Sequence, residues 1–302
     1  MEINSTYQDY SHITEQLAAR SQSETLAVIG LGNMGLALVE GLASKEAFAG
    51  YQILLSNGTV DRSREKLVGF NFPEHIQLAE DNNAALADSH MIFMALKQPA
   101  LQEQLKIWRS EGQLMKDKVI VSLVAGVSMD SIMDWSGNHD QAVVRIMPNT
   151  AAAEGNGVVG WTVNDNVTFG EGKIIQAICD SLGIGIQVES DDGIDKITAL
   201  SGSGIAYFFE MGNQLEKNAL KLGFGQVDAR RIAKQTLFGA AVRAMSKDDS
   251  FETLRNQVTS PNGTTAAALN VLKDNNFDIL INNVVSAAKN RATEIGREYA
   301  NL

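Results

Sequence analysis

The chain has 302 residues, of which 44% are hydrophobic, so it is long and apolar enough to fold into two domains with full cores. Its formal net charge is −11 and it has no block of basic residues, which disfavours nucleic acid and anionic membranes as partners. No stretch approaches the roughly 18 consecutive apolar residues of a membrane span. Residues 1–23 are polar and lack the apolar core of a signal peptide, so we expect a disordered or loosely attached extension there.

Cysteine and histidine usage narrows the chemistry further. Cys179 is the only cysteine, so no disulfide forms within the chain, which suits a reducing cytoplasm. The four histidines are scattered without the spacing of metal ligands, so no metal site is expected.

The first patterned segment, Thr25–Ala43, has the order strand, glycine turn and helix. Leu26–Gly30 is an apolar strand, and the glycines that follow are spaced as G-x-G-x-x-G. Gly30 permits a tight turn, Gly32 lets a pyrophosphate approach the backbone, and Gly35 allows the helix to pack closely on the strand. Free N–H groups at the start of this helix would face the anion, so the segment predicts a dinucleotide site.

The second strand, Tyr51–Leu55, ends in Ser56 and Asn57. Enzymes that use NAD usually carry an acidic residue at this strand end, where it binds the ribose 2′-hydroxyl. Serine and asparagine can instead donate to a 2′-phosphate, so the sequence favours NADP, with NAD as the less preferred cofactor. Arg62 and Arg64 follow; they either add charge to this site or lie in solvent beside a helix cap.

Further strands and helices alternate along the first half of the chain, which indicates a mostly parallel, doubly wound sheet of the Rossmann type. In such sheets the carboxyl ends of the strands line the ligand crevice. We predict this dinucleotide-binding domain over residues 24–190, with helices at 82–87, 101–108 and 171–182 and strands at 91–96, 119–123, 142–146, 157–162 and 184–188.

The pattern changes after Gly193 to helices alone, predicted at 205–222, 228–245, 266–273 and 278–299. We assign residues 191–302 to an all-α domain that binds substrate and dimerises. Long helices rich in alanine and glycine pack closely, often against a second copy, so an intertwined dimer is expected; a monomeric helical bundle is the alternative.

Two segments of this half supply small residues and hydroxyls ahead of a predicted helix. They are Ser201-Gly202-Ser203-Gly204 and Thr259–Thr265, and both suit an anion such as a substrate carboxylate. The first is equally explained by close helix packing, and the second by an ordinary helix cap. Three hydroxyls between Ser260 and Thr265 exceed what a cap requires, which favours a functional role for the second segment.

Six motifs, in this order, resemble the pyrroline-5-carboxylate reductase family: VIGLGNMGLAL, MALK, VSLVAGVSM, VVRIMPNTAA, ITALSGSGIAYFFE and VTSPNGTTAAAL. The resemblance covers nearly the whole chain from Thr25 to Arg297. The chain departs from the family where Ile205 replaces a proline, where Asn262 replaces a glycine, and where Gln98 interrupts an A-V-K-P run. Because asparagine tolerates positive φ, Asn262 is expected to keep the loop shape.

The resemblance implies reduction of the cyclic imine L-1-pyrroline-5-carboxylate to L-proline by NADPH, in a homodimer or a higher homo-oligomer. Thr265 resembles the family's hydrogen-bonding partner of the substrate nitrogen. Ser260 and the backbone of Gly263, Thr264 and Thr265 would bind the substrate carboxylate. The implied cofactor contacts are Gly30, Leu31, Gly32, Asn33, Met34, Gly35, Ser56, Asn57, Asn82, Ala95, Leu96, Lys97, Val124, Ala125 and Gly126.

Two other interpretations stay open on the sequence. One is an NADP oxidoreductase like the β-hydroxyacid dehydrogenases, in which Lys217, followed by Asn218, would be the acid. The other is a non-catalytic NADP-binding regulatory protein on the same fold.

Overall fold

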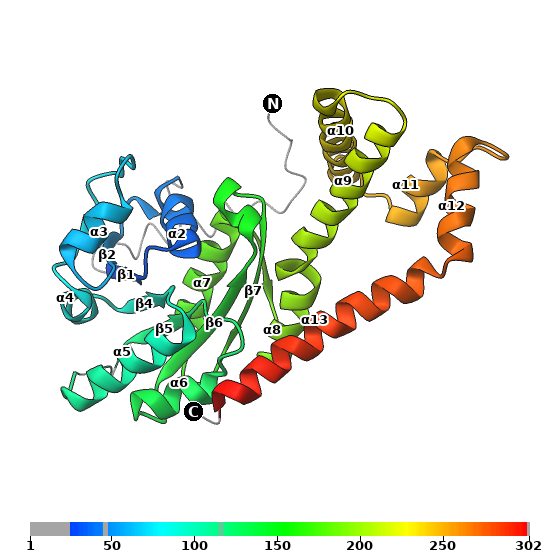
Figure 1. Cartoon of the computed structure of the whole chain (residues 1–302). Coiled ribbons are helices and arrows are strands. Elements are labelled where there is room, and N and C mark those ends of the chain that lie inside the picture. Colours follow the sequence, from blue (N-terminus) through cyan, green and yellow to red (C-terminus); the bar gives the residue numbers. More distant parts are fainter. Residues whose placement is uncertain (1–24, 45–47, 114, 116, 301–302) are drawn as a thin grey trace. The chain divides into compact units, whose positions relative to one another are not determined.

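A computed structural model of the chain describes residues 25–44, 48–113, 115 and 117–300 (Figure 1). The described residues up to Ser203, together with those from Ala288 on, form one compact unit, and Gly204–Ala287 belong to the other. The extension expected at residues 1–23 lies outside the described residues.

The larger unit is built on one sheet of eight strands among the described residues, in the order β3-β2-β1-β4-β5-β6-β7-β8. Neighbouring strands are parallel throughout, except that β6 and β7 are antiparallel. The strands are β1 Thr25–Ile29, β2 Gln52–Ser56, β3 Ile76–Leu78, β4 Met91–Met94, β5 Val119–Ser122, β6 Ala142–Pro148, β7 Gly157–Val163 and β8 Gly183–Gln187.

Helices cover both faces of this sheet. They are α2 Asn33–Ala43, α3 Val60–Lys66, α4 Asn82–Asp88, α5 Gln98–Ser110, α6 Met129–Ser136, α7 Phe169–Ser181 and α8 Asp191–Ile197, with a short 3₁₀ turn at Thr150–Glu154. Successive side chains of a strand point to opposite faces. On β1, Leu26 and Val28 therefore join a core with α2 and α7, and Ala27 and Ile29 join a second core with α5 and α6.

The predicted Rossmann-type fold is confirmed, including both added strands and the helix between them. Strands buried on both faces read as continuous apolar runs, which makes them visible in the sequence. The sequence pattern did not predict β3, α3, α6 and α8, nor, in the smaller unit, α11 Phe251–Gln257. Their lengths are three, seven, eight, seven and seven residues in that order, too few to produce a clear periodic pattern.

The smaller unit is helical, as predicted. It contains α9 Gly204–Lys221, α10 Gln226–Met245, α11, α12 Thr264–Asp274 and the first part of α13 Phe277–Ala300. Helices α9 and α10 pack closely at Gly212, where an added Cβ would lie only 2.8 Å from Leu237 Cδ1. Within the part of the chain that the structure describes, no helix combines the length and apolar character needed to cross a bilayer.

The segment between α8 and α9 corrects the expectation for Ser201-Gly202-Ser203-Gly204. Thr198–Gly202 forms a π-helical turn, and the chain passes through it from α8 into α9. The Ser203 N–H is used inside this turn, donating to the Thr198 carbonyl at 2.8 Å. The segment is therefore not a free helix start, which favours the alternative of close helix packing over an anion site there.

Candidate nucleotide and substrate sites

The three glycines of the turn after β1 have different surroundings: two are tightly packed and one borders open space. Gly30 has a φ of +99°, and a Cβ there would lie 2.5 Å from the Ala95 carbonyl oxygen. A Cβ on Gly35 would lie 1.9 Å from the Gly30 carbonyl oxygen, whereas one on Gly32 would meet nothing within 4 Å. Gly32 is also the N-cap of α2, and no side chain caps that helix. The start of α2 therefore presents open N–H groups, as binding of a pyrophosphate requires.

The loop after β2 is held by Asn82, the first residue of α4. The Ser56 hydroxyl, which is fully buried, donates to Asn82 Oδ1 at 2.7 Å, and the Gly58 N–H donates to the same oxygen at 3.2 Å. Asn57 Oδ1 accepts from the Leu31 N–H at 3.2 Å and so ties this loop to the glycine turn. The Ser56 hydroxyl thus stabilises the loop from its buried side, which corrects its predicted role as a direct donor to a 2′-phosphate.

The structure also separates the two arginines that the sequence left equivalent. Arg64 Nη1 pairs with Asp61 at 3.5 Å. Arg62 makes no ion pair among the described residues; its Nη1 lies 3.8 Å from the position that a Cβ on Gly58 would occupy. The Arg62 guanidinium therefore lies beside the loop at the end of β2, where the adenosine ribose of a dinucleotide is expected.

The ends of β4 and β5 form the next part of this edge of the sheet. Ala95 follows β4, and its N–H donates to the Ile29 carbonyl at 2.8 Å. Lys97 is exposed and is the N-cap of α5, so α5 begins directly at Gln98, which is buried. After β5, the Val124 N–H donates to Ser122 Oγ at 3.2 Å, and Gly126 has a φ of +77°.

Asn149, at the end of β6, was not among the predicted site residues. It is buried, its Nδ2 donates to Ser201 Oγ of the π turn at 2.8 Å, and its Oδ1 has no hydrogen-bond partner among the described residues. A polar residue directly after a strand of a parallel sheet was the signal that could have identified it.

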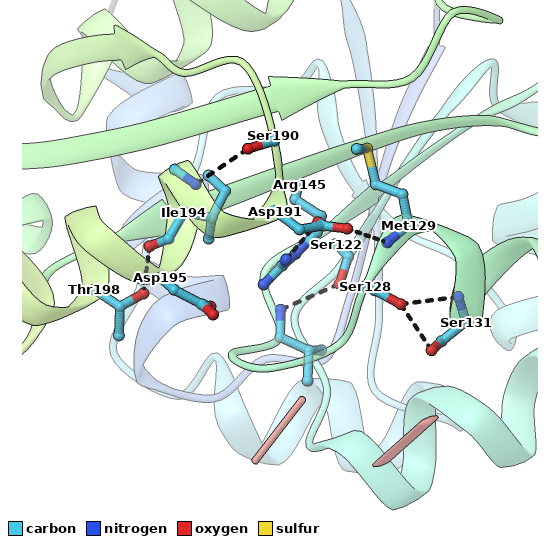
Figure 2. Close-up of polar contacts among 12 residues, drawn as sticks. Ser122, Ser128, Met129, Ser131, Arg145, Ser190, Asp191, Ile194, Asp195 and Thr198 are labelled. Carbon is cyan, nitrogen blue, oxygen red and sulfur yellow. Dashed lines mark hydrogen bonds and ion pairs between the residues drawn. The ribbon is translucent and has the colours of Figure 1, made fainter. Parts of the chain in front are cut away.

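An ion pair between a buried arginine and a partly exposed aspartate fixes α8. Arg145 of β6 pairs with Asp191, whose other carboxylate oxygen accepts from the Met129 N–H at the start of α6 at 3.2 Å (Figure 2). The Arg145 side chain is 3% exposed, so loss of Asp191 would leave a buried charge unpaired. The pair thus binds the strand layer, α6 and α8 together.

The predicted substrate loop lies in the smaller unit, at the start of α12. Asn262 has a φ of +59°, as expected from its replacement of a glycine. A Cβ on Gly263 would lie 2.3 Å from Ser260 Oγ, so a larger residue here would push the Ser260 side chain aside. Gly263 is also the N-cap of α12, with no side-chain cap, so Thr265 is not the cap of this helix.

The free groups at the start of α12 differ slightly from the sequence prediction. The Gly263 N–H donates to the Ser260 carbonyl at 3.1 Å, which corrects its predicted role as a free donor. The N–H groups of Thr264, Thr265 and Ala266 belong to the first turn, which has no intrahelical acceptors. The Thr265 side chain is half-buried and its hydroxyl has no hydrogen-bond partner among the described residues.

Comparisons with known proteins match two family models along the chain. Residues 25–126 match the family described as NADP oxidoreductase, coenzyme F420-dependent, and residues 191–295 match the family described as pyrroline-5-carboxylate reductase dimerisation. The pyrroline-5-carboxylate reductase of Pseudomonas aeruginosa is 33% identical over 273 residues, which cover 90% of this chain and 97% of that protein. The chain belongs to the pyrroline-5-carboxylate reductase family. Pyrroline-5-carboxylate reductase 2 of Bacillus subtilis is 28% identical, over 91% of this chain and 96% of that protein.

Solved structures give the same answer for the fold. The pyrroline-5-carboxylate reductase of Coxiella burnetii superposes with a TM-score of 0.81 at 30% identity, covering 91% of this chain and 98% of that one. The predicted family, fold and NADP-linked oxidoreductase class are therefore confirmed. Lys217, the acid required by the β-hydroxyacid dehydrogenase interpretation, is an exposed residue of α9.

Proposed function

We propose that this member of the pyrroline-5-carboxylate reductase family reduces L-1-pyrroline-5-carboxylate to L-proline with NADPH, as the last step of proline biosynthesis. The use of a dinucleotide cofactor is supported by the glycine turn, in which Gly30 and Gly35 are tightly packed while Gly32 borders open space. If all three glycines served only close packing, an added Cβ would clash at each of the three positions. The direct test is consumption of NADPH that depends on pyrroline-5-carboxylate, together with proline-dependent reduction of NADP at high pH.

The residues along the carboxyl edge of the sheet fit an extended dinucleotide. The start of α2, with Leu31, Asn33 and Met34, would bind the pyrophosphate, and the loop of Asn57 and Arg62 would receive the 2′-phosphate. The other half of the cofactor would extend along Ala95–Lys97 and Val124–Gly126. The nicotinamide, when bound, supplies the hydride.

The substrate requires an anion site and a group that orients its ring nitrogen. The open N–H groups at the start of α12, with Ser260, suit the carboxylate, because a helix N-terminus favours a negative charge. The Thr265 hydroxyl can donate to or accept from the imine nitrogen directly or through water. A threonine hydroxyl has no useful pKa near neutrality, so Thr265 orients the nitrogen or relays a proton and does not act as a strong acid.

A homodimer is the form that the smaller unit supports. Large apolar side chains there are widely exposed, unlike those of a monomer with a finished core: Phe208, Phe209, Leu222, Val227, Phe238, Phe251, Val271, Ile279 and Leu280 are between 54% and 83% exposed. Burial of these side chains against a second copy would remove most of this surface from water. A fully active 32.6 kDa monomer in sedimentation experiments would contradict the dimer.

The cytoplasm is the proposed compartment. The support for it is chemical, because Cys179, the only cysteine of the sequence, is a free thiol buried in the larger unit. Burial also raises the pKa of the Cys179 thiol well above its ordinary value, so it is not a reactive thiolate.

A further inference from the structure

The last turns of α13 make a close backbone contact with the loop after β5. A Cβ on Gly296 would lie 2.9 Å from the Gly126 carbonyl oxygen. From the other side, a Cβ on Gly126 would lie 2.5 Å from Ile295 Cγ2. The helix and the loop thus meet through two glycines, with no room for a methyl group on either.

The helical side of this contact is firmly anchored to the sheet unit. Thr293 Oγ1 donates to Asp195 of α8 at 2.9 Å, and Lys289 Nζ pairs with Asp192 at 2.7 Å. Tyr299 packs against the core formed by α5 and α6. Since Asp191 fixes α8 to Arg145 (Figure 2), this part of α13 is tied through α8 to the strand layer.

The loop has fewer restraints. It begins at Val124, whose N–H donates to Ser122 Oγ, and ends at Val127, which is fully buried. Between these points Ala125 is exposed and Gly126 adopts a positive φ. A group that crowds the contact from α13 would therefore displace the loop and leave the helix in place.

We propose that Gly296 is a positioning residue for the cofactor. Because Gly296 has no side chain, α13 packs directly on the Val124–Gly126 loop and fixes the position of this loop at the carboxyl end of β5. The inference rests on the proposed function, in which this loop contacts the half of NADPH that carries the nicotinamide. A displaced loop would misplace that half and weaken its binding, although Gly296 itself touches no ligand.

The test compares Gly296→Ala with Gly172→Ala, a matched change on helix α7 of the same unit. A Cβ on Gly172 meets nothing within 4 Å, so that variant gains helix propensity and no clash. We expect Gly296→Ala to raise the Kd of NADPH about tenfold and to lower kcat/KM for NADPH by up to about a hundredfold. Gly172→Ala should leave the Kd of NADPH, kcat and KM unchanged. At saturating NADPH, the KM of either variant for pyrroline-5-carboxylate should match that of the wild type.

Binding is measured by NADPH fluorescence at a temperature where circular dichroism shows each variant to be folded. If Gly296→Ala does not fold, Ile295→Ala replaces it; this variant shortens the side chain that lies beside the open face of Gly126, and a Kd about threefold higher is expected. An NADPH affinity equal to that of Gly172→Ala, in whichever variant folds, overturns the proposal. A wild-type protein that neither binds NADPH nor reduces pyrroline-5-carboxylate would contradict the proposed function instead, so the two failures are distinguishable.

Discussion

Replacement of Arg62 by alanine should reduce the preference for NADPH, whereas replacement of Arg64 should not. The Arg62 guanidinium lies beside Gly58, at the end of β2, and has no ion-pair partner among the described residues. Arg64 is already paired with Asp61, and both side chains are exposed, at 68% and 86%. The two variants remove the same charge two residues apart, so each controls for the other's effect on the net charge.

The expected size follows from the exposure of Arg62. A hydrogen bond to a charged group contributes about 1.5–3 kcal/mol. Because the guanidinium is exposed and screened by salt, we take the lower end, about 1.5 kcal/mol, which is about tenfold in affinity. Loss of the exposed Arg64–Asp61 pair should cost about 0–1 kcal/mol of stability and no cofactor affinity.

The assay is the ratio of kcat/KM for NADPH to that for NADH, measured at low and high ionic strength. Arg62→Ala should lower this ratio about tenfold at low salt, with the value for NADH unchanged, because NADH lacks the 2′-phosphate. The difference from wild type should shrink at high salt. An unchanged ratio in Arg62→Ala, or an equal fall in Arg64→Ala, would refute the assignment of Arg62.

Three further outcomes are expected. Gly32→Ala should keep the thermal midpoint of the wild type without NADPH but lose the rise in midpoint that NADPH causes. Gly35→Ala should lower the midpoint even without NADPH, since its Cβ would lie 1.9 Å from the Gly30 carbonyl oxygen. Equal midpoints of the two variants, both with and without NADPH, would contradict this difference. Thr265→Val should lower kcat by roughly ten- to a thousandfold and leave the Kd of NADPH unchanged, and full turnover with a lowered midpoint would make Thr265 a structural residue. The hydrogen bonds from Lys196 and Lys289 lower the pKa of Asp192 from 3.8 to about 2, so its stabilising effect is complete above pH 3.8 and is lost as the pH falls towards 2. The thermal midpoints of wild type and Asp192→Asn should converge over that range, and a constant difference would show that Asp192 does not contribute.

The sequence predicted the sheet well, for a physical reason. Strands such as Met91–Met94 and Val119–Ser122 are buried along their whole length, so each appears as an uninterrupted apolar run. The glycine turn was equally clear, and the structure bears out the tight turn at Gly30 and the close packing at Gly35.

Features that depend on three-dimensional geometry were not accessible in the same way. The Ser201–Gly204 segment has the composition of a helix start, and only the bond from the Ser203 N–H to the Thr198 carbonyl shows that a π turn leads through it into α9. Ser56 stands at the expected strand end, but its side chain turns inward to Asn82. The contact between Gly126 and Gly296 joins positions far apart in the chain, so no local sequence pattern predicts it.

The most direct test of the account is the quantity of L-proline formed from L-1-pyrroline-5-carboxylate by the purified wild-type protein, measured together with the NADPH consumed. We predict one L-proline for each NADPH, with slower turnover in NADH. A folded protein that binds NADPH but forms no L-proline would contradict the proposed reductase activity.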